Sequence, residues 1–265
     1  MTTSNDTLLV WQRPIPSGRP GAAALSPEEV AAEGVALADR EGLHTVSVKR
    51  VASKLNVPLT RVEGYLRSRE DLLDLMLDAA LGEIELPPRD PSVDWRADLS
   101  AIAHATQAAA LRHPWLRSLA GTRIPCGPAG LRHTERVLEA VDGMGLDPAT
   151  ATHSVNTVLA FVYGFVQLEM GVSGRKDDAS IERRTATAHY LMDAIAGGEY
   201  PALARVFSDA SISTDDAFEK GLGYVLDGVG LQIERAGGAK PGETGGSADA
   251  TAAPRSAARR ARRRS

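Results

Sequence analysis

The residues best suited to bind a polyanion lie close together, between positions 48 and 69. This stretch carries a single acid, Glu63, and six cations: Lys49, Arg50, Lys54, Arg61, Arg67 and Arg69. The cationic excess is local, because the whole chain has a formal net charge of −4. Lysine and arginine neutralise phosphates, and the fork of an arginine also matches the O6 and N7 acceptors of guanine. The stretch therefore predicts contact with duplex DNA.

Two short helices are expected to position these cations. Apolar residues recur at helical spacing on both sides of a break, in the order Val48, Val51, Ala52, Leu55, Val62 and Leu66. The break is Asn56-Val57-Pro58, where proline pushes the residue before it out of the helical region. The pattern predicts a helix-turn-helix with helices over 48–56 and 59–66. A preceding helix starts at the capping sequence Ser26-Pro27-Glu28-Glu29 and ends at Gly42.

The rest of the chain is expected to be helical as well. Helices are predicted over 69–84, 94–110, 115–121, 131–141, 147–168, 181–195, 202–207 and 215–233. The fold class is therefore all-α, with a three-helix DNA-binding domain over 26–68 and a larger helical domain over 69–234. The helix over 147–168 is apolar on more than one face, so we expect it in a domain centre or against a partner subunit.

The two ends of the chain are expected to lie outside these domains. Residues 1–25 are rich in proline and glycine, which predicts a flexible arm. A plain leader is favoured over an arm that touches DNA, because Arg13 and Arg19 are few. Residues 235–265 end in six arginines between Arg255 and Arg264, which predicts a disordered basic tail. Non-specific DNA affinity and a solvated terminus are equally open interpretations of the tail.

Composition narrows the class of protein. Hydrophobic residues make up 43% of the 265 residues and aromatic residues 5%, which favours a helical globular chain. A single cysteine, Cys126, excludes an internal disulfide framework and fits a reducing cytoplasm. No apolar run approaches the ~20 residues that span a bilayer, and the first residues do not follow the order of a secretory signal. We expect a cytoplasmic protein with no membrane partner.

No arrangement typical of an enzyme is present. The sequence has no glycine-rich phosphate loop, no CxxC and no HExxH motif. Cys126 precedes His133, but a chance neighbour is a better interpretation than a catalytic pair, because nothing marks a third, orienting group. His104, His113 and His133 are expected to be polar pocket or surface residues. We therefore expect no catalytic residue, no metal site, no cofactor and no enzymatic activity.

Several short motifs follow one another in an order that one family shares. In the N-terminal part they are Glu41-Gly42-Leu43, Val46-Ser47-Val48, Val51-Ala52, Leu55-Asn56-Val57 and Ser68-Arg69-Glu70-Asp71-Leu72-Leu73. Further along they are Asp94-Trp95-Arg96, Arg112-His113-Pro114-Trp115-Leu116, Gly145-Leu146-Asp147-Pro148 and Phe218-Glu219-Lys220-Gly221-Leu222. Over about residues 8–233 the chain resembles the TetR family of bacterial transcriptional regulators, in its tetracycline-repressor-like branch.

The resemblance implies a ligand-responsive DNA-binding regulator, namely a repressor that a small-molecule effector releases from a palindromic operator in double-stranded DNA. It also implies an all-helical homodimer, in which residues 69–234 form the ligand-binding and dimerisation domain. The helices over 147–168 and 215–233 would pair with their symmetry mates in a four-helix interface.

Positions in the family's motif assign roles in DNA binding. The phosphate contacts fall on Ser47, Tyr65 and Arg69, and the base contacts on Leu59, Thr60, Arg61 and Gly64. Arg61 is the strongest candidate for reading guanine. Lys49, Arg50 and Lys54 divide between phosphate contact and ordinary solvation.

The third helix departs from the family pattern. The family's Leu-Tyr-x-His run is here Val62-Glu63-Gly64-Tyr65. Glu63 accepts from a cytosine N4 or pairs with Arg67 in one interpretation; in the other it weakens DNA binding. Gly64 weakens the helix by roughly 1 kcal/mol against alanine. We favour intact binding with altered specificity; the alternative function is a helical small-molecule-binding protein with weakened or lost operator binding.

A ligand pocket is expected between the helices over 69–84 and 147–168. Its predicted wall consists of Ile102, Thr106, Trp115, Leu119, Arg123, His133, Asn156, Phe161 and Phe165. Each apolar member taken alone is better interpreted as core. Asn156 and His133, if buried there, need hydrogen-bond partners that a ligand could supply. The metal-binding histidine of the tetracycline repressor aligns near Leu119, so magnesium–tetracycline is not expected.

Overall fold

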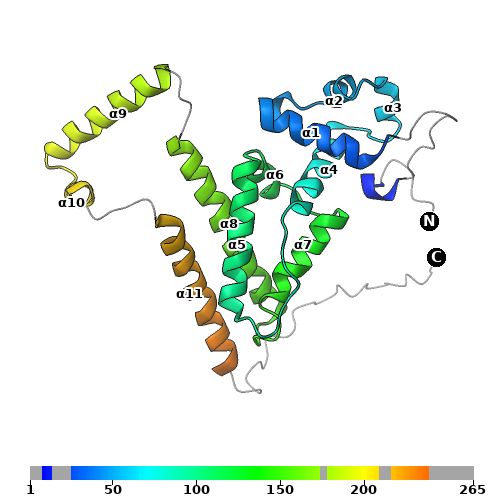
Figure 1. The fold of residues 1–265 in the computed structure, drawn as a ribbon. Coiled ribbons are helices and arrows are strands. Elements are labelled where there is room, and N and C mark those ends of the chain that lie inside the picture. The colour runs from blue at the N-terminus through cyan, green and yellow to red at the C-terminus, as the bar shows by residue number, and fades with distance from the viewer. Residues whose placement is uncertain (1–7, 14–24, 174–177, 209–215, 239–265) are drawn as a thin grey trace, which may run out of the picture.

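A computed structural model describes residues 8–13, 25–173, 178–208 and 216–238 of the chain. Within these ranges every regular element is a helix (Figure 1), so the all-α prediction is confirmed. A small N-terminal unit sits at one end of a bundle of longer helices.

The N-terminal unit consists of α1 (Pro27–Glu41), α2 (Val48–Lys54) and α3 (Leu59–Glu63). The Ser26 side chain accepts a hydrogen bond from the Glu29 backbone N–H, and the Glu29 carboxylate accepts one from the Ser26 N–H. This reciprocal cap satisfies two backbone donors at the start of α1. The predicted beginning of this helix is therefore confirmed.

Glycine and asparagine close the first two helices of the unit. Gly42 caps α1 with a φ of 89°, a conformation that glycine adopts without steric cost. Asn56 lies in the left-handed region with a φ of 53°, which asparagine tolerates better than most residues. The predicted turn between α2 and α3 is confirmed.

The third helix is shorter than predicted. It ends at Glu63, whereas the apolar spacing predicted a helix as far as Leu66. Gly64 follows at once, and glycine has a low helix propensity. The chain then turns, with the Tyr65 N–H donating to the Val62 carbonyl at 3.0 Å.

Helix α4 (Arg69–Gly82) connects this unit to the rest of the chain and packs along α1. The two helices approach closely at Gly34, where an added Cβ would lie 2.9 Å from the Met76 sulfur. One hydrophobic core runs from α1 through α4 to Trp115, Leu116 and Leu119. Packing is therefore continuous across residue 68, where the sequence predicted a domain boundary; that boundary stays a prediction.

A second core holds the longer helices together. It joins α5 (Trp95–Arg112), α7 (Pro128–Glu139), α8 (Pro148–Ser173) and α11 (Ala217–Gly238). Helix α8 packs against α5 and α11, and the short α6 (Leu116–Ala120) lies between α5 and α8.

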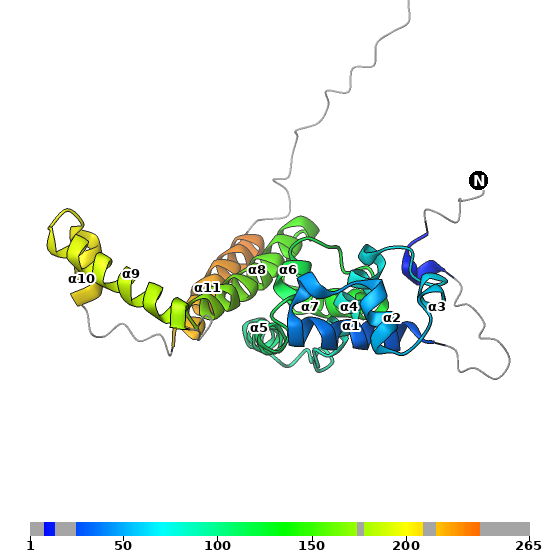
Figure 2. The ribbon, with the colours of Figure 1, turned by 90° about the horizontal axis from the view of Figure 1, so that it is seen from above.

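Two helices stand away from this bundle. Helices α9 (Asp178–Ala196) and α10 (Pro201–Ser208) pack against one another, and α10 and most of α9 project away from α8 and α11 (Figures 1 and 2). Their exposed apolar side chains are Ile181, Tyr190, Met192, Tyr200, Val206 and Phe207.

Residues 8–13 correct the prediction of a flexible N-terminal arm. They form a short 3-10 helix, η2 (Val10–Gln12), and Val10 is buried in the first core. Arg13 reaches the carboxylate of Asp71 at the start of α4. Composition alone does not reveal that these side chains have buried partners on distant elements. Arg19 and the arginines of the basic tail lie outside the described residues.

Candidate nucleic-acid interface and effector site

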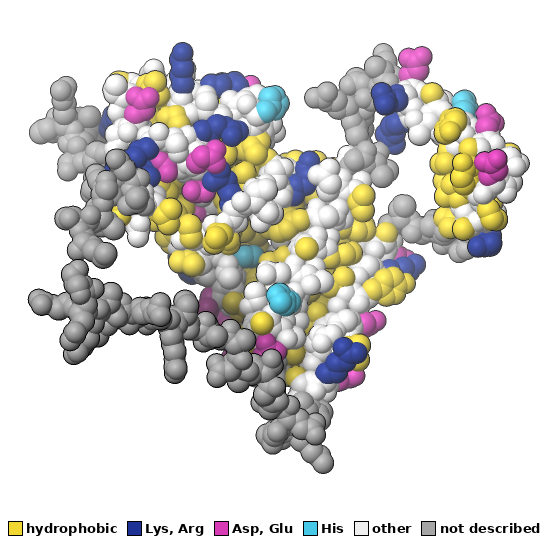
Figure 3. Space-filling view, turned by 180° about the vertical axis from the view of Figure 1, so that it is seen from behind, with side chains coloured by type: hydrophobic (Ala, Val, Ile, Leu, Met, Phe, Trp, Pro, Cys, Tyr) yellow, Lys and Arg dark blue, Asp and Glu magenta, His cyan; other side chains and the backbone are white. Residues whose placement is uncertain are grey.

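Helices α2 and α3 present the predicted DNA-binding residues at the free end of the N-terminal unit. They pack against one another, and the exposed side chains on them include Lys49, Lys54, Thr60 and Glu63. Leu59 and Arg61 are half-buried, and Gly64 is exposed just after α3. Figure 3 shows Lys and Arg side chains gathered over this unit, with acids among them. The structure thus groups these residues on one small unit, and their contacts with DNA stay predictions.

Ser47 and Arg50 also have local structural roles. The Ser47 hydroxyl accepts from the Arg50 backbone N–H at 3.3 Å and so caps α2. The Arg50 guanidinium pairs with Glu41 at 2.7 Å, and this hydrogen bond lowers the pKa of the Glu41 carboxyl. These contacts hold α2 against the end of α1.

Tyr65 and Arg69 lie beyond α3 in different environments. Tyr65 is 8% exposed and belongs to the first core, and burial raises the pKa of its phenol to about 12. Arg69 is exposed and donates to the carbonyls of Val46 and Leu43, each at 2.9 Å. Of the three predicted phosphate contacts, Tyr65 is buried, Ser47 is half-buried and Arg69 is exposed.

A polar cluster around the buried His113 joins the N-terminal unit to the larger domain. His113 is 3% exposed; its Nδ1 lies 2.9 Å from an Asp39 oxygen and its Nε2 2.9 Å from a Glu83 oxygen. The indole N–H of Trp115 donates to the same Asp39 carboxylate at 2.6 Å. Trp115, predicted in the pocket wall, therefore faces α1. Asp39 and Glu83 had no signal in the sequence, because their partners lie 74 and 30 residues away.

Arg123 belongs to the same junction. Its guanidinium pairs with Asp74 and Glu70 on α4. It was predicted to line the ligand pocket, but in the structure two acids already hold its charge. These contacts tie the segment after α6 to the beginning of α4.

Five of the seven remaining predicted pocket residues lie in two environments. Ile102 and Thr106 on α5 and Leu119 on α6 are buried, and the Thr106 hydroxyl donates to the Ile102 carbonyl at 2.8 Å. Phe161 and Phe165 on α8 are half-buried, and their ring centroids lie 5.5 and 5.2 Å from that of Phe218.

Asn156 departs from the expectation of a buried polar group. It is exposed on α8, because the adjacent Val155 and Val158 take the buried positions of that helix. The Asn156 amide therefore reaches solvent and needs no ligand in a closed pocket to satisfy it.

His133, in contrast, is a buried polar group, as the sequence predicted. It is 8% exposed on α7, and neither ring nitrogen has a hydrogen-bond partner. Burial lowers the pKa of this imidazole from 6.5 to about 4, so it is neutral near pH 7. Buried polar groups are nearly always paired in native proteins. His133 is therefore the predicted pocket residue that most clearly lacks a partner within the protein.

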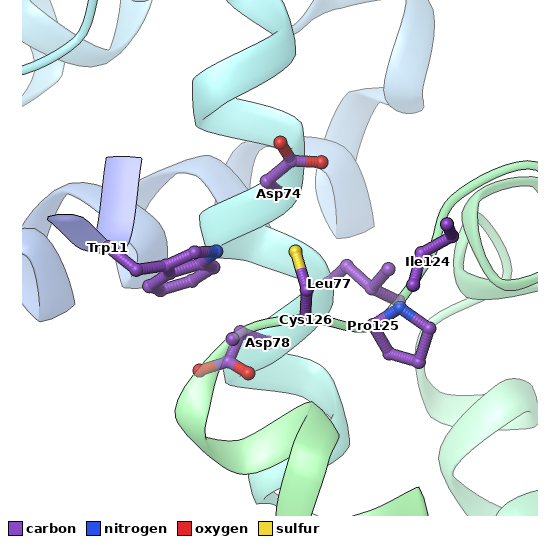
Figure 4. A pocket seen from close by; sticks show the side chains of 8 residues that line it. Trp11, Asp74, Leu77, Asp78, Ile124, Pro125 and Cys126 are labelled. Atoms are coloured by element: carbon purple, nitrogen blue, oxygen red, sulfur yellow. The ribbon is translucent and has the colours of Figure 1, made fainter. Parts of the chain in front are cut away.

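Cys126 lies in a crevice whose lining does not include His133, in agreement with the interpretation that the two are chance neighbours in the sequence. The crevice is lined by residues of η2, α4 and the segment before α7, and Figure 4 shows the thiol directed toward α4. Gly127 is tightly enclosed there, since an added Cβ would lie 2.6 Å from the Trp11 ring. Among the described residues no three His, Cys, Asp or Glu side chains gather in a way that could hold a metal ion.

A groove of about 340 Å³ runs between α1 and α4. Its floor is apolar, with Ala31, Val35 and Leu75 among its residues, and His113 is also part of its lining.

None of the helices in the described ranges is both long and apolar enough to cross a membrane.

A helix-turn-helix unit mounted through α4 on a helical core is the architecture of a DNA-binding regulator. Comparison with known proteins agrees. Residues 87–233 match the family model described as the tetracyclin repressor-like C-terminal domain. The chain belongs to the TetR family of transcriptional regulators.

Relatives and solved structures support this assignment. An HTH-type transcriptional regulator of Saccharopolyspora erythraea is 31% identical over 83% of this chain and 90% of its own length. The HTH-type transcriptional repressor DrrR1 of Streptomyces coeruleorubidus is 30% identical over 88% of each chain. The structure of ActR from Streptomyces coelicolor in complex with actinorhodin shares the fold, with a TM-score of 0.67, 24% identity, and coverage of 78% of this chain and 96% of ActR.

Proposed function

We propose that this regulator is a repressor that binds its operator as a homodimer and is released by a small-molecule effector. The similarity to the repressor DrrR1 over 88% of the chain supports repression. The grouping of Lys49, Thr60 and Arg61 on α2 and α3 supports operator contact through the N-terminal unit. Phosphate neutralisation by the cations supplies affinity, and Arg61 supplies base preference.

The outer faces of α8 and α11 support a dimer. Tyr224 and Leu231 on α11 are 74% and 45% exposed, and Leu168 on α8 is 70% exposed. Gly164 and Gly228 have open space where a Cβ would point, so a second pair of helices can approach closely at these positions. Apolar residues on neighbouring helices mark a contact surface, and a twofold pair of α8 and α11 would make a four-helix interface.

The α9–α10 pair adds to that surface. Its apolar side chains are exposed, and Figure 3 shows hydrophobic side chains gathered along it. A single subunit leaves this surface in water, which is costly. A second subunit is the partner that we propose for it.

His133 is the observation that carries the effector site. A buried neutral imidazole offers one donor and one acceptor, and a ligand with a hydroxyl or carbonyl group would satisfy them. ActR, which shares this fold, is known with actinorhodin bound. Effector binding would favour dimers whose recognition helices no longer match half-sites roughly 34–36 Å apart.

The test is a gel shift of the full chain with the DNA upstream of its own gene. We expect a retarded complex whose affinity falls steeply with salt, because several phosphates are neutralised. A small-molecule library is then screened for compounds that raise the melting temperature of the protein and dissociate the protein–DNA complex. Absence of any DNA complex, together with ligand-induced stabilisation, would support instead a small-molecule-binding protein that has lost its operator.

A further inference from the structure

Both ring nitrogens of His113 face carboxylates, and this geometry fixes the state of the ring. Nδ1 lies 2.9 and 3.1 Å from the two Asp39 oxygens, and Nε2 lies 2.9 Å from a Glu83 oxygen. A neutral imidazole has one N–H and can satisfy only one of the two carboxylates. Only the imidazolium donates to both, so this arrangement requires a protonated His113.

In the protonated state, the cations in direct contact with Asp39 and Glu83 balance the charges of these two carboxylates. Arg112 on α5 pairs with Glu83 at 3.2 Å, so two cations face the two carboxylates. Trp115 is a neutral donor to Asp39. The other charged or titratable groups nearby line the adjoining grooves: Glu28, Asp78, His44 and Arg117.

The three partners lie on elements that must keep their relative positions. Asp39 belongs to α1, Glu83 caps the end of α4, and His113 caps the end of α5 just before α6. The cluster therefore spans the junction between the DNA-binding unit and the larger domain.

We propose that His113 is the positioning residue that fixes α1 on the larger domain, and that its proton closes this connection. Only the expected effect on operator binding rests on the proposed function. Loss of the proton removes the hydrogen bond from His113 to one of the two carboxylates and weakens the connection between α1 and the larger domain. Operator binding then weakens, because two recognition helices must be ordered again at a fixed separation.

The pH window follows from the contacts. Burial acts to lower the pKa of His113, but the hydrogen bonds that the ring donates to Asp39 and Glu83 outweigh it and raise the pKa above 6.5. A base whose folded pKa is raised contributes stability that is complete below the unfolded value. That stability is lost as pH rises through the folded value.

Trp115 provides a direct readout that needs no DNA. Its ring centroid lies 5.6 Å from that of His113, and a protonated imidazole quenches indole fluorescence more strongly than a neutral one. In the full chain with Trp11→Phe and Trp95→Phe, we expect the emission to rise as the pH increases above 6.5. The rise should vanish in His113→Gln and persist in His104→Gln, whose pair with Glu219 lies elsewhere.

Glu83→Gln keeps the histidine and serves if His113→Gln does not fold. It should move the midpoint of the emission curve to lower pH, because one opposite charge is removed. An emission curve that is flat above pH 6.5, or a midpoint unmoved by Glu83→Gln, would overturn the protonated connection.

Operator coupling is measured with a duplex that the full chain selects from a randomised pool at pH 6.5. Its Kd should rise about threefold or more between pH 6.5 and 9.0, beyond the change seen in His113→Gln. Equal pH profiles for the two proteins would overturn the coupling while leaving the fluorescence result intact. Failure to select any duplex would instead count against the proposed function.

Discussion

Arg13 and Asp71 form a bidentate ion pair that joins the N-terminal segment to the first turn of α4. The Arg13 nitrogens lie 2.5 and 3.1 Å from the two Asp71 oxygens, and the two side chains are 10% and 12% exposed. Burial acts to raise the pKa of Asp71, but hydrogen bonds from Arg13 and from the Arg67 backbone outweigh it and lower this pKa. The pair therefore contributes to stability at neutral pH.

Arg13→Ala should lower the free energy of unfolding by about 3 kcal/mol, because it leaves the buried Asp71 charge unpaired. Chemical denaturation at pH 7 measures this. Arg40→Ala is the matched control; its pair with Glu33 is exposed and should contribute less than about 1 kcal/mol.

The sign of the pH dependence distinguishes this mechanism. Because the folded pKa of Asp71 is depressed, its contribution is present above the ordinary value of 3.8 and is lost as pH falls through the folded value. The penalty of Arg13→Ala should therefore shrink below about pH 3.8. An equal penalty at pH 7 and at low pH would refute the ion-pair account.

His133→Leu should raise the stability of the ligand-free protein by about 1 kcal/mol at pH 7, because it removes buried nitrogens that have no partner. It should also abolish the response to an effector found by screening. Denaturant unfolding and gel shift measure the two effects. A loss of stability in this variant would show that the imidazole is satisfied within the native protein.

His133 also predicts that the stability of the protein depends on pH below 6.5. The unfolded chain binds a proton at His133 near pH 6.5, while the folded chain binds it only near pH 4. The free energy of unfolding should therefore decrease as the pH is lowered from 6.5 to about 4, by about 3 kcal/mol in total. His133→Leu should remove that part of the slope, whereas the exposed His153→Gln should retain it.

Arg61→Ala should relax base preference at one position in each half-site, at a cost of about 1–3 kcal/mol for the preferred base. Selection from a randomised duplex pool measures it. Lys54→Ala is the control, because an exposed lysine near phosphate should weaken all sequences alike and reduce the salt slope. Unchanged selectivity in Arg61→Ala would reject its role in base reading.

Tyr224→Arg should convert the proposed dimer into monomers, because it places a charge in the exposed apolar face of α11. Sedimentation equilibrium measures the mass. Leu111→Arg changes a side chain on α5 that is 42% exposed and should leave the mass unchanged. A dimer that persists in Tyr224→Arg would place the subunit contact elsewhere.

The sequence by itself determined the helices and the family. Local signals sufficed: the Ser26 cap, the Gly42 and Asn56 turn positions and the apolar spacing all act within one helical turn of the residues concerned. The motifs from Glu41 to Leu73 then indicated a TetR regulator, and the cations of α2 and α3 followed from their positions on those helices.

Only the tertiary structure decided which polar groups find partners. Arg13 is 58 residues from Asp71, and His113 is 74 residues from Asp39, so no local pattern couples them. Trp115 and Arg123 looked like pocket residues but meet acids of α1 and α4, whereas His133 meets none. The physical reason is that pairing and burial depend on which elements pack together, and that information is absent from the spacing of residues along one helix.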